Sequence, residues 1–258
     1  MFKVIAIAGH DMKSSLHSFS FYLLMCFFFG VTGYFFWANL SYFSLVSFQA
    51  ATNPAARIEG LNMTEAVLSP FLSNVGALML LLVPILSMRS FSEERRQGTL
   101  ELLYTYPVSE TQILLGKYFS MIGFVFVLIL PTVVYFPLAQ SVGAKFELDS
   151  ILTGYLGLLL IGASFAALGI FVSALTPNHM VSAGIGFALI LFFWIVGWVA
   201  DWTSPAIGKI FHELSLIDHF RDFSFGVIDT KDIVFYVLFI VFFLFSTLCA
   251  MEIRTWKR

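Results

Sequence analysis

The charged residues of the chain are concentrated in one short segment. Only 12% of the 258 residues are Asp, Glu, Lys or Arg, yet six of them fall between positions 89 and 101. They are Arg89, Glu93, Glu94, Arg95, Arg96 and Glu101. Ionised carboxylate and guanidinium groups form the strongest hydrogen bonds that side chains make. The segment therefore has the chemistry to contact a charged partner surface, although charges that only solvate a loop would give the same pattern.

A second polar group lies in residues 201–231. Asp218, His219 and Asp222 offer ligand atoms of the kinds that hold a metal ion. The apolar residues that recur at helical spacing around them are Ile210, Leu214, Ile217 and Phe220. We interpret the polar residues as the solvated face of a short amphipathic or re-entrant helix, because solvated faces are commoner than metal sites.

The sequence contains none of the common motifs for nucleotide binding or hydrolysis. A P-loop needs G-x-x-x-x-G-K-[ST], and neither Gly116-Lys117 nor Gly208-Lys209 is followed by Ser or Thr. There is no G-x-S-x-G or H-E-x-x-H motif, and the five His residues show no spacing typical of a metal site. The formal net charge of −2 gives no sign of nucleic-acid binding. We therefore expect no catalytic, cofactor-binding or metal-binding residues in this chain.

Composition and charge spacing predict an all-α integral membrane protein. Hydrophobic residues make up 59% of the chain, with a mean hydropathy of +0.89, whereas soluble domains are roughly 45–50% apolar. Long charge-free gaps separate the charged segments, and a spanning helix needs about 20 apolar residues. We predict six spans, over residues 19–42, 67–88, 113–138, 150–174, 180–200 and 232–251. Their interiors lack ionisable residues, which argues against an ion-coupled carrier, since such carriers bind the ion at charged groups inside the membrane.

The distribution of Lys and Arg orients the chain. An even number of spans places both termini on one side, together with the loop that begins at Arg89, and this side carries nine Lys and Arg against five on the other. We therefore predict cytoplasmic termini, a cytoplasmic loop at 89–112 and an extracytoplasmic segment at 201–231. Residues 1–258 form a single transmembrane domain in this interpretation.

Local signals predict how the segments outside the spans fold. An apolar stripe at helical spacing, which includes Ile5, Gly9 and Met12, predicts an amphipathic elbow helix over residues 1–18 at the membrane interface. An early start of the first span is the alternative. Pro177 predicts a turn at residues 176–179 between the fourth and fifth spans, and Asp229 is predicted to cap the last span.

The loop at 89–112 contains two helix-capping signals. Ser90 has capping-box spacing to Glu93, so a helix can begin near Phe91. Pro107 ends this helix, and Ser109 is placed to cap the third span. The pattern predicts a short helix that lies across the ends of two spans and is joined to both, so that it can transmit movement from a cytoplasmic partner.

The loop resembles the signature of the type-two family of ABC-transporter permeases. In that family E-[ER]-x-x-G-T-L-E-x-L-L is followed by P-[VL]-S and G-K, which lie here within residues 89–103, at 107–109 and at 116–117. The resemblance covers most of the chain, including the elbow, the six spans and residues 225–232 at the entry to the last helix. This last motif is most similar to the gliding-motility-associated permease subgroup, and more distantly to nitrous-oxide-reductase maturation permeases.

The resemblance implies a permease subunit in the bacterial cytoplasmic membrane that pairs with a second permease, identical or paralogous, and two copies of a P-loop ATPase subunit. ATP and Mg would bind to the ATPase subunit, and residues 91–105 would be the coupling helix seated in its groove. The resemblance implies that four charged residues contact the ATPase subunit: Glu93, Glu94, Arg95 and Arg96. The resemblance also implies that the helix docked on the ATPase subunit contains Gly98, Thr99, Leu100 and Glu101.

Three functions remain open at this stage. The first is ATP-driven export or extrusion across the membrane. The second is mechanotransmission, in which the same cycle drives an extracytoplasmic auxiliary protein and nothing crosses the chain. Candidate docking residues for that partner are Asp218, Arg221, Asp222 and Asp229. The third, a membrane scaffold or enzyme unrelated to ATP, is disfavoured because the sequence has no catalytic motif.

Overall fold

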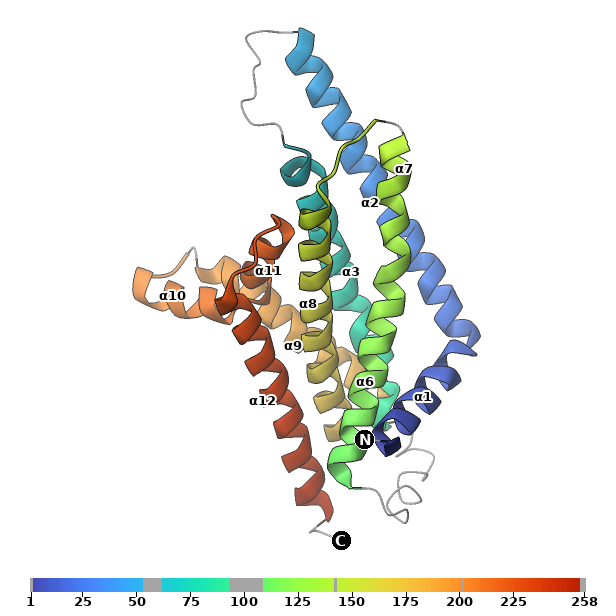
Figure 1. Cartoon of the computed structure of the whole chain (residues 1–258). Coiled ribbons are helices and arrows are strands. Elements are labelled where there is room, and N and C mark those ends of the chain that lie inside the picture. The colour runs from blue at the N-terminus through green and yellow to red at the C-terminus, as the bar shows by residue number, and fades with distance from the viewer. Residues whose placement is uncertain (1, 53–61, 93–108, 142, 201, 256–258) are drawn as a thin grey trace.

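The chain folds into a bundle of long helices (Figure 1). The computed structural model describes residues 2–52, 62–92, 109–141, 143–200 and 202–255, and the elements within these ranges are all helical, as predicted. In chain order they are α1 (Phe2–Leu16), α2 (Phe19–Thr52), the π-helix η2 (Thr64–Leu68), α3 (Ser69–Ser87), α6 (Glu110–Ile129), the 3₁₀-helix η3 (Leu130–Val134), α7 (Tyr135–Ser141), α8 (Leu148–Leu175), α9 (His179–Ala200), α10 (Pro205–Leu214), α11 (Leu216–Ser224) and α12 (Thr230–Thr255).

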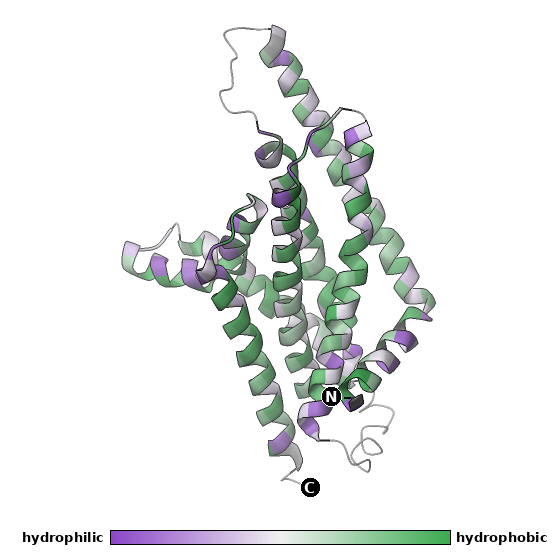
Figure 2. Ribbon diagram, in the orientation of Figure 1, coloured by the Kyte–Doolittle hydropathy of each residue, from purple (hydrophilic) through white to green (hydrophobic). Residues whose placement is uncertain are grey.

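Six of the described helical stretches are long and apolar enough to cross a membrane, which confirms the predicted number. They are Phe19–Ala50, Thr64–Ser92, Glu110–Ser141, Leu148–Leu175, His179–Ala200 and Thr230–Ile253. Figure 2 shows apolar residues along most of their length. We call the end of the bundle that carries α1 and the last turn of α12 the terminal end, and the part that carries α10 and α11 the outer segment (Figure 1).

Two spans differ in detail from the expectation. The first continues from residue 42 to Thr52 because residues 43–52 contain no Gly or Pro to end a helix. The third is interrupted by η3, whose Pro131 lacks a backbone N–H and cannot continue the α-helical hydrogen bonds. The predicted turn between the fourth and fifth spans is confirmed, since α8 ends at Leu175 and α9 begins at His179.

Helix α8 forms the centre of the bundle. It packs against α3, α6, α9, α11 and α12, and most of its length is buried. Glycines on α8 allow these close approaches: a Cβ atom on Gly157 would lie 2.6 Å from the Cβ of Phe223 on α11. In lipid the hydrophobic effect does not drive helices together, so they associate by close packing, which small residues allow.

Replacing Gly157 by Ala is expected to destabilise the bundle by about 1–3 kcal/mol, because the added methyl group overpacks the contact with α11. Its nearest neighbour would be the Cβ of Phe223, which moves only with the backbone. SDS-induced unfolding of the purified chain measures the change. Gly184→Ala on α9 is the matched control, because a Cβ there meets nothing within 4 Å. An equal response of the two variants would contradict the packing argument.

The outer segment contains two short helices where one was expected. Helix α10 ends at Leu214, and Ser215 then caps α11 by accepting a hydrogen bond on its Oγ from the Asp218 N–H at 3.3 Å. Helix α10 lies across the direction of the spans (Figure 1). After α11 the chain turns through Gly226, whose φ of +83° suits glycine, and Asp229 caps α12 as predicted through the Lys231 N–H at 3.0 Å.

Candidate functional site

The predicted coupling residues fall in residues 93–108, which lie outside the described part of the chain. They are Glu93, Glu94, Arg95, Arg96, Gly98, Thr99, Leu100, Glu101 and Pro107. The structure describes both flanks of this loop. We call these flanks, together with the side chains that fix them, the loop base; it comprises residues 88–92, residues 109–117, Asp11 and Ser173.

The first flank is hydrogen-bonded to the terminal end of α8. The N–H groups of Phe91 and Ser92 donate to the Oγ of Ser173 at 3.1 and 3.2 Å, and this hydroxyl donates to the Met88 carbonyl at 3.0 Å. The Ser92 hydroxyl donates to the Thr176 carbonyl at 2.9 Å. A serine hydroxyl offers one donor and two acceptor positions, so Ser173 uses all three. The start of the loop is therefore fixed to the central span.

The second flank begins where the sequence predicted. The Ser109 Oγ accepts the Gln112 N–H at 3.3 Å and caps α6. Helix α1 packs along this part of α6, and a Cβ on Gly116 would lie 2.8 Å from the Cβ of Ile7. Gly116 therefore belongs to the contact between α1 and α6. Ile5, part of the predicted apolar stripe, faces outward and is 63% exposed.

Lys117 connects three segments of the loop base. Its side chain is only 3% exposed, and its Nζ lies 3.5 Å from the Asp11 Oδ2 on α1. The same Nζ lies 5.1 Å from the centre of the Phe91 ring, close enough for a cation–π contact. The sequence drew attention to Lys117 but not to Asp11, because no local pattern links positions 106 residues apart.

Of the four predicted docking residues, three lie on α11 and Asp229 directly precedes α12. They form two groups. Asp218 pairs with the Nδ1 of His212 at 2.9 Å, and the Arg221 guanidinium lies over the Phe225 ring at 5.8 Å. Asp222 and Asp229 both face the Lys231 Nζ, at 3.6 and 3.4 Å. The backbone N–H of Lys231 lowers the pKa of the partly exposed Asp229 carboxyl below its ordinary value.

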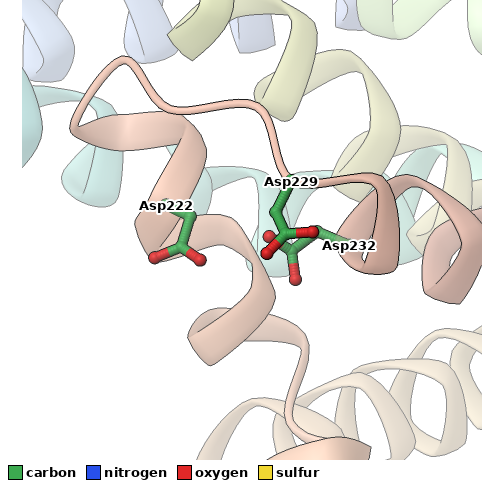
Figure 3. Close-up of side chains that lie close together, drawn as sticks. All are labelled: Asp222, Asp229 and Asp232. Atoms are coloured by element: carbon green, nitrogen blue, oxygen red, sulfur yellow. The ribbon is translucent and has the colours of Figure 1, made fainter.

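Three carboxylates of the outer segment come close together (Figure 3). Asp222, Asp229 and Asp232 each offer an oxygen within 4.8 Å of the others. The set weighed from the sequence, Asp218 with His219 and Asp222, does not assemble, because Asp218 pairs with His212 instead. Lys231 supplies a positive charge to Asp222 and Asp229. We interpret the three carboxylates as an ion-pair network.

A buried His–Asp pair joins α11 to α12. The Nδ1 of His219 lies 2.7 Å from the Asp232 Oδ1, and the two side chains are 7% and 1% exposed. The His219 ring also stacks on Phe235, with 3.9 Å between ring centres. His219 lies on α11 and Asp232 on α12, and the pair depends on the turn at residues 225–229 that brings the two helices together.

Two tyrosine hydroxyls inside the bundle form hydrogen bonds between neighbouring helices. The Thr132 hydroxyl lies 2.6 Å from the Tyr155 hydroxyl, and the Tyr135 hydroxyl donates to the Phe29 carbonyl at 2.6 Å. These bonds join α2, η3, α7 and α8 around a cluster of aromatic rings that includes Phe36 and Phe136. The described groups therefore act as helix–helix contacts.

Six apolar spans, with α8 at their centre, define a multi-pass membrane protein. The chain matches the family described as ABC-2 family transporter protein over residues 5–223, and it belongs to that family. A search of the curated proteins finds no match. The family match agrees with the resemblance of the loop and does not distinguish the subgroups.

Proposed function

We propose that the chain couples ATP hydrolysis on a separate ATPase subunit to export or extrusion across the bacterial cytoplasmic membrane, with both termini cytoplasmic. Residues 91–105 are the coupling helix, and Glu93, Glu94, Arg95 and Arg96 contact the ATPase. Two ATPase copies carry ATP and Mg, and a second permease completes the membrane part. The absence of a P-loop motif from the sequence supports a separate ATPase chain.

The observation that carries this proposal is the loop base. One flank of the loop is fixed to α8 through Ser173, and the other is fixed to α1 through Lys117 and Asp11. A displacement of the loop is therefore transmitted to the central span α8 as well as to the two spans that the loop connects. A packed interior transmits such a displacement because it has low compressibility.

The charge exchange Glu94→Arg/Arg95→Glu tests the coupling contact. We expect the double variant to insert normally but to lose at least tenfold in co-purification with the ATPase subunit, because like charges would then face each other in the interface. Pull-down from membranes and ATPase activity of the complex measure the effect. The adjacent gene is the first place to find the ATPase.

The matched control exchanges a charge pair on α10, in the outer segment. Lys209→Glu/Glu213→Arg alters two exposed residues four apart on α10 and leaves the net charge unchanged. This variant is expected to retain the ATPase. Unchanged assembly and ATPase activity in the loop variant, or equal loss in the control, would count against the coupling role.

The surface of the outer segment supports a second candidate function, mechanotransmission to an extracytoplasmic protein. Asp222 and Asp229 are partly exposed beside two compact helices, which form a charged surface. An extracytoplasmic auxiliary protein that docks there would receive the movement of α11 and α12 without any solute crossing. The resemblance of residues 225–232 to gliding-motility-associated permeases supports this alternative. ATP turnover without solute flux in a reconstituted complex, together with a partner retained by this surface, would favour it over export.

A further inference from the structure

A pocket of about 400 Å³ opens in the outer segment between α3, α9, α10 and α11. This volume falls within the range of roughly 300–1,000 Å³ that is typical of small-molecule sites. Gly197 forms part of its wall, and a Cβ there would collide with Asp218 and would lie 2.6 Å from the Ser215 Oγ. The pocket therefore depends on the absence of a side chain at this position.

Two opposite charges line the pocket without pairing with each other. Asp218 and Arg221 are three residues apart on α11, which places them on one face of that helix. Asp218 is held by His212, and Arg221 contacts the Phe225 ring. Within the described ranges, Arg221 forms no ion pair. A guanidinium with five N–H donors is therefore available to an oxyanion.

The wall that carries Arg221 is fixed. The Ser224 hydroxyl donates to the Arg221 carbonyl at 2.7 Å, so its oxygen accepts the hydroxyl of Ser69 on α3 at 2.9 Å. Both serines are buried. This chain of bonds fastens the end of α11 to α3 and sets the position of the Arg221 backbone.

The surroundings of the pocket match the border of a bilayer. Trp198 lines the pocket and is 59% exposed, and Trp202 lies just beyond the end of α9. Tryptophan is enriched at membrane–water borders. Helix α10 lies across the spans (Figure 1). It exposes Ile207 and Ile210, as an interfacial amphipathic helix does.

We propose that this outer pocket binds the head group of a phospholipid that carries both a phosphate and a primary ammonium group. Arg221 binds the phosphate, Asp218 accepts hydrogen bonds from the ammonium group, and the acyl chains lie along Trp198 and Phe225. A purely anionic head group would place its charge next to the Asp218 carboxylate, and a quaternary amine has no N–H to donate. The site goes beyond the coupling function and does not depend on it.

The test uses the full-length chain in nanodiscs that contain equal amounts of dioleoyl-phosphatidylethanolamine, -phosphatidylcholine and -phosphatidylglycerol. After transfer to detergent, native mass spectrometry counts the lipids that remain bound. We expect wild-type protein to retain phosphatidylethanolamine at least fivefold over the other two. Arg221→Gln and Asp218→Asn are each expected to lower this retention at least fivefold, and Gly197→Ala is expected to lower it by reducing the pocket.

Lys209→Gln is the matched control, because it removes one positive charge from exposed α10 outside the pocket. It is expected to retain phosphatidylethanolamine as wild type does. Because Arg221 is exposed, its variant should fold, and gel filtration checks this. Retention by the Arg221 and Asp218 variants equal to that of wild type would overturn the proposal. Preferential retention of phosphatidylglycerol, or equally effective competition by water-soluble phosphoethanolamine, would also overturn it.

Discussion

In the Ser173→Ala chain, the Phe91 and Ser92 amides are expected to exchange hydrogen about tenfold faster or more. The substitution removes the acceptor of two buried N–H groups, at 3.1 and 3.2 Å, and leaving a buried donor unsatisfied costs about 1–3 kcal/mol. A local opening energy that falls by about 1.4 kcal/mol raises the open population tenfold. Hydrogen-exchange mass spectrometry of the peptide around residue 91 measures the effect.

The same variant is expected to uncouple ATP hydrolysis from transport or from the movement of an extracytoplasmic partner. If the loop is the coupling helix, the ATPase still binds it, but the loop no longer moves with α8. We expect ATPase activity in the complex to remain within about twofold of wild type. Transport, or the movement of an extracytoplasmic partner, is expected to fall about tenfold, because a tenfold loss corresponds to about 1.4 kcal/mol of coupling free energy.

Ser164→Ala provides the control on the same helix. Ser164 is also buried on α8, but its hydroxyl donates to the Leu160 carbonyl within the same helix. Its loss should leave both the exchange rate at residue 91 and the coupling unchanged. If Ser173→Ala behaves like Ser164→Ala in both measurements, the hydrogen bonds of the loop base do not couple the loop to α8.

The features that follow from local pattern were predictable from the sequence. Pro177 marked the turn between α8 and α9, and Ser109 and Asp229 marked the first turns of α6 and α12, because caps and proline breaks act over a few residues. The six spans were predictable for a related reason. Each needs only a long apolar run, and the runs are separated by charged segments or, between α8 and α9, by the turn at Pro177.

The contacts that define the loop base could not be predicted in this way. Ser173 is one of several serines in the apolar spans, and nothing near it in the sequence marks it as the acceptor for Phe91 and Ser92. Asp11 lies far along the chain from Lys117. Such pairs depend on how helices pack, and the position of α1 against α6 follows from the shapes of Gly116 and Ile7.

The Asp232→Ala chain is expected to be less stable by about 3–5 kcal/mol, the loss typical of removing one partner from a buried charged pair. Asp232 is fully buried in the first turn of α12, with its Oδ1 2.7 Å from the Nδ1 of His219. A negative charge there also suits the positive end of the helix dipole. SDS-induced unfolding of the purified chain measures the loss.

The geometry of His219 indicates how its pair with Asp232 is protonated. Its Nε2 lies 3.2 Å from the Glu213 carbonyl, which can only accept, so Nε2 carries a hydrogen. The contact between Nδ1 and Asp232 then holds one proton, on the imidazole or on the carboxyl. Both arrangements leave the pair without net charge, which lowers the penalty of burying it. Asp232→Asn can donate a side-chain N–H to the Nδ1 of a neutral His219, and it is expected to lose less stability than Asp232→Ala.

Asp229→Ala separates this buried contact from the ordinary capping of α12. Asp229 is the partly exposed cap three residues earlier, and its loss is expected to cost about 1 kcal/mol. A much larger loss for Asp232→Ala would show that the His219 contact holds α11 onto α12. Equal losses for the two variants would mean that the carboxylate serves only the helix end. In that case the outer segment would have to be held by apolar contacts such as Phe223 against α8.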